Sequence, residues 1–75
     1  MPNQTRVISL HFSPATLHVA LADGRELSLP LARFPRLAAA TPQQLDDWHL
    51  IGRGLGIQWT QLGEDLSVES LLASE

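Results

Sequence analysis

The sequence has 75 residues and no cysteine, which excludes disulfides and thiolate metal sites. Hydrophobic residues make up 44% of the chain, a content typical of globular proteins and too high for a disordered one. The formal net charge is −3 and every basic residue is a scattered arginine, which argues against binding nucleic acid by charge alone. A single domain over residues 1–75 is expected, and a homodimer would add burial to so small a core.

The sequence also lacks targeting and membrane signals. The amino-terminal residues do not combine a basic run with an apolar core and a small-residue cleavage site. No apolar stretch approaches the roughly 20 residues that a membrane-spanning helix needs. We therefore expect a cytoplasmic protein without a membrane partner.

Alternating side chains in the first half of the chain predict three strands, over 5–12, 17–22 and 27–31. In the first strand, the alternation places Ile8 on the buried side, in phase with Leu10 and Phe12, and Val7 on the opposite side. Turn residues at 13–16 and 22–24 separate the strands.

The loop at 22–24 sets the register of the second and third strands. A two-residue loop would pair Val19 with Ser28 and so place an apolar row opposite a polar row. A three-residue loop pairs Val19 with Leu27 instead. Because a slip of one residue moves every side chain to the other face, burial favours the longer loop, with Gly24 in a left-handed conformation.

Short helices are predicted in the middle of the chain. Pro30 should close the third strand, and 33–40 should form a helical turn interrupted by Pro35. A hydroxyl cap, a proline and a glutamine at 41–44 indicate the start of a second helix, expected to end near Trp48 or His49.

The last third of the chain is predicted to hold a strand and a helix. Three glycines between Ile51 and Trp59 indicate a tight connection into a strand, and 64–67 should lead into a final helix over 68–73. The predicted fold class is therefore α+β: an antiparallel, hairpin-rich sheet with two or three short helices on one face.

The glycine-rich segment 52–56 invites comparison with phosphate-binding loops. The dinucleotide fingerprint requires a third glycine at the position that Ile57 occupies, and no long helix follows to receive a phosphate. The segment is therefore predicted to be a turn between strands, and no cofactor is expected.

Two histidines are weak candidates for a metal site. If Phe12 pairs with Leu17 across the first turn, His11 lies opposite His18 on the solvent face of the sheet. Two imidazoles there could form half of a metal site, whose third ligand would have to come from Glu26. The simpler interpretation is two exposed histidines on a sheet face, without a metal.

No group of residues predicts an enzyme, and no catalytic residue is proposed. His49 beside Asp46–Asp47 is compatible with a general base and its orienting carboxylate. However, no serine or cysteine stands in a nucleophile motif. The acidic residues Glu64, Asp65 and Glu69 are typical of a helix start, where they match the positive end of the dipole.

Arg33 and Arg36 form the one local cluster of basic residues. A helix-turn-helix needs two helices of moderate length, for which the predicted strands leave no room. Direct DNA binding is therefore the alternative to binding a protein partner, which short helices and free sheet edges suit better.

An ordered series of short motifs along nearly the whole chain resembles the small prokaryotic proteins grouped as "domain of unknown function 2442". The series consists of Asp23-Gly24-Arg25, Pro30-Leu31, Phe34-Pro35-Arg36-Leu37, Ala40-Thr41-Pro42, Trp48, Ile51-Gly52, Gly54, Gly56-Ile57-Gln58-Trp59, Glu64-Asp65-Leu66-Ser67-Val68-Glu69 and Leu71-Leu72. The resemblance implies an α+β fold, found elsewhere joined to a helix-turn-helix regulator. It also implies an antitoxin-like role, since stand-alone members often neighbour a second small family suspected of being toxins.

The sequence and the resemblance together predict a partner-binding module, the antitoxin-like component of a toxin–antitoxin pair. The partner would be the product of the adjacent gene. The contact residues are predicted to be Arg33, Arg36, Trp59, Glu64 and Asp65, beside an apolar edge. The alternatives are a DNA-binding transcriptional autoregulator and a binder of metal or a small ligand.

Overall fold

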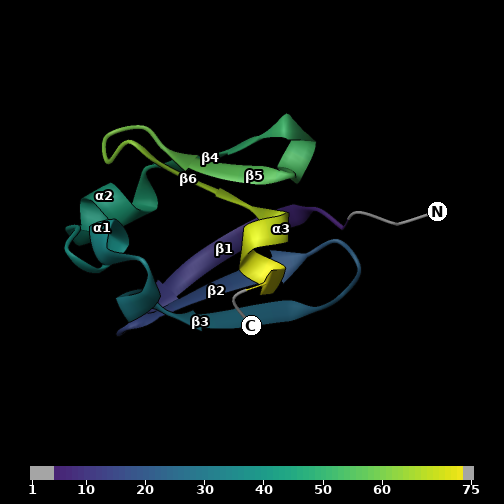
Figure 1. The fold of residues 1–75 in the computed structure, drawn as a ribbon, viewed down its shortest axis with the longest axis horizontal. Coiled ribbons are helices and arrows are strands. Elements are labelled where there is room, and N and C mark those ends of the chain that lie inside the picture. Colours follow the sequence, from purple (N-terminus) through teal and green to yellow (C-terminus); the bar gives the residue numbers. More distant parts are fainter. Residues whose placement is uncertain (1–4, 74–75) are drawn as a thin grey trace.

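The computed structural model describes residues 5–73, which form two three-stranded antiparallel sheets and short helices (Figure 1). Sheet A has the order β1-β2-β3 and sheet B the order β4-β5-β6. The elements in chain order are β1 (Val7–Ser13), β2 (Thr16–Leu21), β3 (Glu26–Pro30), η1 (Leu31–Arg33), α1 (Pro35–Ala38), α2 (Pro42–Asp46), β4 (Trp48–Ile51), η2 (Gly52–Gly54), β5 (Gly56–Trp59), β6 (Glu64–Ser67) and α3 (Val68–Ala73). The α+β class is confirmed, with the strands divided between two sheets.

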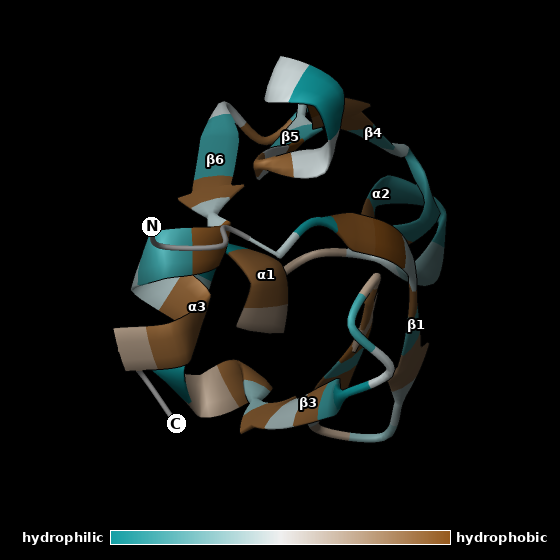
Figure 2. Ribbon diagram, turned by 90° about the vertical axis from the view of Figure 1, so that its right-hand side faces the viewer, coloured by the Kyte–Doolittle hydropathy of each residue, from teal (hydrophilic) through white to brown (hydrophobic). Residues whose placement is uncertain are grey.

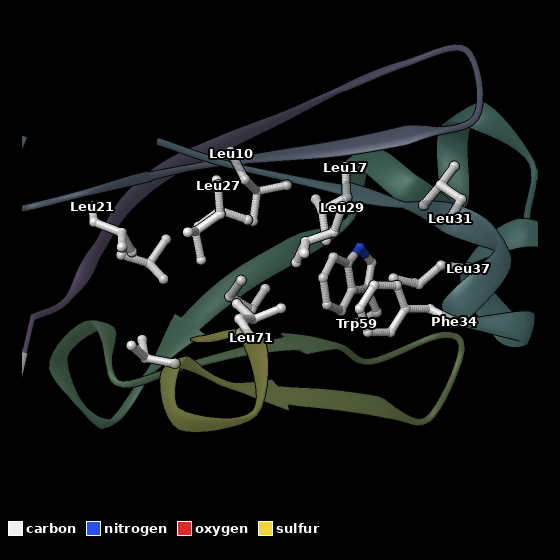
Figure 3. Close-up of a cluster of buried hydrophobic side chains, with 14 residues drawn as sticks. Leu10, Leu17, Leu21, Leu27, Leu29, Leu31, Phe34, Leu37, Trp59 and Leu71 are labelled. Carbon is white, nitrogen blue, oxygen red and sulfur yellow. The ribbon is translucent and has the colours of Figure 1, made fainter. Parts of the chain in front are cut away.

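One apolar core lies between the two sheets, and side chains from both sheets and from the helices fill it (Figure 3). Its buried members are Val7, Leu10, Leu17, Val19, Leu21, Leu27, Leu29, Leu31, Phe34, Leu37, Ile57, Trp59, Val68 and Leu71. Seen along the long axis of the molecule, sheet B lies above sheet A and α3 stands at one side, near both (Figure 2). Since burial removes apolar surface from water, this shared core is what holds the sheets together.

The hairpin of β2 and β3 confirms the register predicted from burial. Val19 pairs with Leu27 and Leu17 with Leu29. The Leu21 amide donates to the Arg25 carbonyl at 2.9 Å, so the loop is three residues long. At its tip the glycine has φ +93°, the left-handed conformation expected there.

An exposed carboxylate stabilises the same loop. Asp23 accepts a hydrogen bond from the Arg25 amide at 3.0 Å and another from its Nε at 2.8 Å. The hydrogen bond from the Arg25 backbone amide and the neighbouring Arg25 guanidinium lower the pKa of Asp23 below its ordinary value. Because the pKa of Asp23 is lowered in the folded state, its hydrogen bonds contribute to the stability of the fold at neutral pH. This stabilisation is lost as the pH falls through the lowered pKa.

The prediction for the start of β1 was wrong. Ile8 is 61% exposed, and Val7 is buried in its place. The register shifts between Val7 and Ser9, which pair with Leu21 and Ala20. This β-bulge inserts one residue into the strand and reverses the alternation on its amino-terminal side.

The two helices in the middle of the chain are shorter than predicted. The capping box of α2 is confirmed: the Gln44 amide donates to Thr41 Oγ1 at 3.1 Å, and the Thr41 amide donates to Gln44 Oε1 at 3.0 Å. However, α2 ends at Asp46, and Trp48 begins β4 because it pairs with Trp59 of β5. Likewise Pro35 does not interrupt a helix; it starts α1.

The segment 64–67 is strand β6, and α3 follows it over the predicted residues. Glu64 and Asp65 are therefore ladder residues, and the prediction that they lie at a helix start was wrong, whereas Glu69 does lie in the first turn of α3. Within residues 5–73, no helix is long and apolar enough to cross a membrane.

The turn η2 joins the two sheets through close backbone packing. Gly52, Arg53 and Gly54 all have positive φ. A Cβ atom on Gly54 would lie 2.8 Å from the Val7 carbonyl oxygen of β1. Nearby, Arg6 Nη1 donates to the Arg53 carbonyl at 2.8 Å. The approach of β1 to η2 therefore requires glycine at position 54.

We predict that Gly24→Val destabilises the domain by about 1–2 kcal/mol or more, because a β-branched side chain is strained at positive φ. Gly24→Asn is the matched control, since asparagine tolerates this conformation and nothing lies within 4 Å of the added Cβ. Urea denaturation measures both, and equal stability of the two variants would contradict the loop conformation.

We predict that Gly54→Ala destabilises the domain more than Gly52→Ala. Both glycines have positive φ, but a Cβ on Gly52 would meet Leu55 Cβ at an ordinary 3.6 Å. The difference therefore isolates the clash with β1, for which we expect roughly 1–3 kcal/mol. Thermal melting of the two variants gives the comparison, and a larger effect at position 52 would refute this packing.

Candidate partner-binding surface

Arg36 links two segments that are far apart in the sequence. It lies on α1. Phe34, at the amino-terminal cap of this helix, and Leu37, within it, are buried and anchor the helix in the core. From there Arg36 Nη1 donates to the carbonyl oxygens of Leu62 and Gly63, both at 3.3 Å, across 26 and 27 residues. The guanidinium therefore fastens α1 to the turn between β5 and β6.

The turn at 60–63 presents those two carbonyls because its own backbone is closed. The Leu62 amide donates to the Trp59 carbonyl at 3.2 Å, and the Gly63 amide donates to the Thr60 carbonyl at 3.3 Å. Gly63 has φ +63°, and a Cβ there would lie 3.6 Å from Arg36 Nη1. A left-handed glycine and one arginine thus fix the tip of the β5–β6 hairpin.

Trp59 belongs to the core and has no exposed surface. Its Nε1 donates to the Leu45 carbonyl of α2 at 3.0 Å. Its ring meets Phe12 of β1 edge-on, with ring centroids 6.4 Å apart. Trp59 was predicted to be a contact residue, but a buried ring cannot be presented to a partner. Its role is to pack in the core.

The two acidic residues of β6 lie on opposite faces of sheet B. Glu64 pairs with Trp59 and is half-buried, on the side facing the core. Asp65 pairs with Gln58 and is exposed on the outer face. Of the predicted contact residues, the structure thus groups Arg36 with the turn that precedes Glu64, and it separates Asp65 from them.

Arg33 is exposed at the end of η1, and the non-helical Phe34 separates it from α1, which carries Arg36. We define the Arg36 surface as Arg33, Arg36, Leu62, Gly63 and Glu64, of which Leu62 and Glu64 are half-buried. It combines two cations, one carboxylate and a half-buried leucine. The sequence indicated its charged members but gave no sign of Leu62 or Gly63, because carbonyl acceptors carry no side-chain signal.

The paired histidines of sheet A are confirmed in position. His11 lies opposite His18, and their rings are stacked with centroids 4.6 Å apart. Glu26 lies opposite Ala20, as expected. Among residues 5–73, no cluster of three or more His, Cys, Asp or Glu side chains could hold a metal.

His49 lies on the outer face of sheet B, where its Nε2 is 2.8 Å from Gln58 Oε1 of the paired strand. Its hydrogen-bonding partner is therefore an amide and not the carboxylates of Asp46–Asp47. The strand alternation that places Ile57 and Trp59 inward could have indicated Gln58 as the cross-strand neighbour.

A depression of about 260 Å³ opens beside the glycine-rich turn, on the outer side of sheet B. It is lined by Ile51, Gly52, Leu55, Gly56, Asp65, Leu66 and Ser67. Its floor is Gly56, where a Cβ would lie 3.0 Å from Ile51 Cγ1. The segment is the turn between strands that the sequence predicted, and its lining is mainly apolar.

Solved structures of two bacterial proteins are similar to this chain. One, a protein of unknown function from Rhodospirillum rubrum, is 29% identical with a TM-score of 0.81, covering 95% of this chain and 88% of the other. The second, an uncharacterized protein from Chromobacterium violaceum, is 28% identical with a TM-score of 0.77, covering 92% of this chain and 65% of the other. No curated protein matches. Residues 7–75 match the family described as "Protein of unknown function (DUF2442)", and the chain belongs to that family.

Proposed function

We propose that this domain is a partner-binding module, the antitoxin-like component of a two-protein pair, and that it contacts its partner through the Arg36 surface. The observation that carries the proposal is the pair of hydrogen bonds from Arg36 to Leu62 and Gly63. They hold α1 and the β5–β6 turn in one arrangement before any partner arrives. A surface ordered in advance loses less conformational entropy on binding.

The composition of the Arg36 surface supports a protein as the ligand. Protein interfaces favour arginine at their centre, where its planar guanidinium pairs with carboxylates and its stem packs on apolar side chains. Arg36 reaches the carbonyl of the half-buried Leu62, whose side chain offers such an apolar contact. The expected partner surface presents carboxylates next to an aliphatic or aromatic side chain.

The same surface suits DNA less well. Glu64 directly follows Gly63, whose carbonyl accepts from Arg36, so a carboxylate stands next to the turn that Arg36 binds. A phosphate backbone would be repelled by that carboxylate and by the net charge of −3. These charges favour a protein partner over direct binding to DNA by this domain.

We predict that the domain co-purifies with the product of the adjacent reading frame when the two are co-expressed with a tag on the neighbour. Arg33→Glu should weaken the complex at least tenfold, as loss of an arginine at an interface centre does. This variant leaves both hydrogen bonds of Arg36 in place. Arg25→Glu is the matched control, because Arg25 is exposed in the β2–β3 loop of sheet A.

Isothermal titration of the purified proteins measures the affinities, and circular dichroism verifies that the variants are folded. Two independently eluting proteins, together with a neighbour that is harmless when expressed alone, would refute the antitoxin-like pairing. Equal weakening by Arg25→Glu and Arg33→Glu would refute the Arg36 surface as the contact. A gel shift of the upstream DNA by the domain alone would instead support the autoregulator.

A further inference from the structure

The outer face of sheet A carries an ordered row of polar side chains across all three strands. His11 of β1, His18 of β2 and Ser28 of β3 lie side by side in this row, and Ser13 lies in the next. The other face of the same strands is buried in the core. The row is therefore held on a rigid support, since the strands that carry it are anchored in the core.

The two imidazole rings are stacked face to face. Their centroids are 4.6 Å apart and their planes differ by 11°. His11 is exposed and His18 is half-buried. In this stack the lone pairs of the ring nitrogens lie in two nearly parallel planes, so a shared ion requires one ring to turn, and the exposed ring of His11 has the space to do so.

Hydrogen bonds to two serines fix the orientation of the His18 ring. Its Nε2 lies 2.7 Å from Ser13 Oγ, and its Nδ1 lies 3.1 Å from Ser28 Oγ. In a neutral imidazole one nitrogen donates and the other accepts. In either tautomer, one serine Oγ therefore accepts a hydrogen bond from the ring N–H, and the second ring nitrogen accepts one from the other serine. A metal can replace that second serine at the nitrogen lone pair.

We propose that His11 and His18 together bind one divalent transition-metal ion, Cu²⁺ most tightly, through one imidazole nitrogen each. Metal–nitrogen bonds of about 2.0–2.1 Å require two adjacent ligand nitrogens roughly 3 Å apart. Because parallel rings cannot both direct a lone pair at one ion, the exposed ring of His11 turns out of the stack to bind. Water and a serine hydroxyl complete the coordination, so the site is an open one.

The surroundings of the pair resemble those of other histidine metal sites. A ligating histidine usually donates its second ring N–H to a fixed acceptor, and a serine Oγ takes that role for His18. Glu26 lies on the same face, two residue pairs further along β2 and β3, where its carboxylate attracts cations. Imidazole ligands favour the later divalent metals of the first transition row, among which Cu²⁺ binds most tightly.

The test is a calorimetric titration of the full chain with CuCl₂ at neutral pH, with electron paramagnetic resonance of the same samples. We expect one equivalent bound and a spectrum with hyperfine coupling to two equivalent imidazole nitrogens. His11→Gln should lower the affinity at least tenfold and leave one coupled nitrogen. This variant keeps both hydrogen bonds of His18, so its fold should be intact, which its melting temperature verifies.

His49→Gln is the matched control, since His49 lies on the outer face of the other sheet. It should bind Cu²⁺ as the wild type does. The proposal is overturned if the wild type takes up no Cu²⁺, if His11→Gln binds as tightly as the wild type, or if His49→Gln is the variant that loses the ion. None of these outcomes depends on the Arg36 surface, so this test is independent of the proposed function.

Discussion

The burial of Trp59 is the interaction on which the rest of the fold depends. This residue stands in the central strand of sheet B, and its ring packs edge-on against Phe12 of sheet A. Its indole N–H fastens α2 through the Leu45 carbonyl. A chain of 75 residues without cysteine has no covalent reinforcement. The two sheets therefore stay together only while this shared apolar core is intact.

The core also accounts for where chemistry can occur in this domain. The inward faces of both sheets are occupied by apolar side chains, and no polar or charged residue of the described chain is buried. Polar groups that could act on another molecule lie instead on outer faces and in turns. Two such groups are ordered by hydrogen bonds: the Arg36 surface and the histidine pair of sheet A. They are built on different sheets, and a ligand could occupy either without displacing core residues.

Sequence reasoning succeeded where one local rule was sufficient. The register of β2 and β3 followed from matching apolar rows across a loop, and the opposition of His11 and His18 followed from the turn before β2. The cap at Thr41 is a short-range pattern in which each partner is visible in the sequence. In these cases the interacting residues are close along the chain, and few alternatives compete.

It failed where strand pairing and packing overrode the local sequence pattern. The bulge at Ile8 lies next to the place where β1 meets η2, and the hydrogen bond between Arg6 and Arg53 there spans 47 residues of sequence. Trp48 was expected at the end of a helix but lies in β4, because its pairing with Trp59 extends sheet B. The two acidic residues of β6 resembled a helix start, and only the ladder with β5 makes them a strand.

The candidate surface shows the same division. Arg33, Arg36 and Glu64 were identified from charge and resemblance, whereas the bonds from Arg36 to the turn at 60–63 depend on the tertiary fold. Trp59 was predicted to be a contact on the family resemblance, as part of the motif Gly56-Ile57-Gln58-Trp59. The structure gives it a different role, since it has no exposed surface.

Hydrogen–deuterium exchange of the domain, alone and in complex with the co-expressed partner, tests the central claim most directly. The account predicts that the partner slows exchange at the amides of 33–37 and 60–64, the two segments that Arg36 joins. Amides of β2 on sheet A should exchange at the same rate in both samples. Protection confined to sheet A, with none in the β5–β6 turn, would contradict the account.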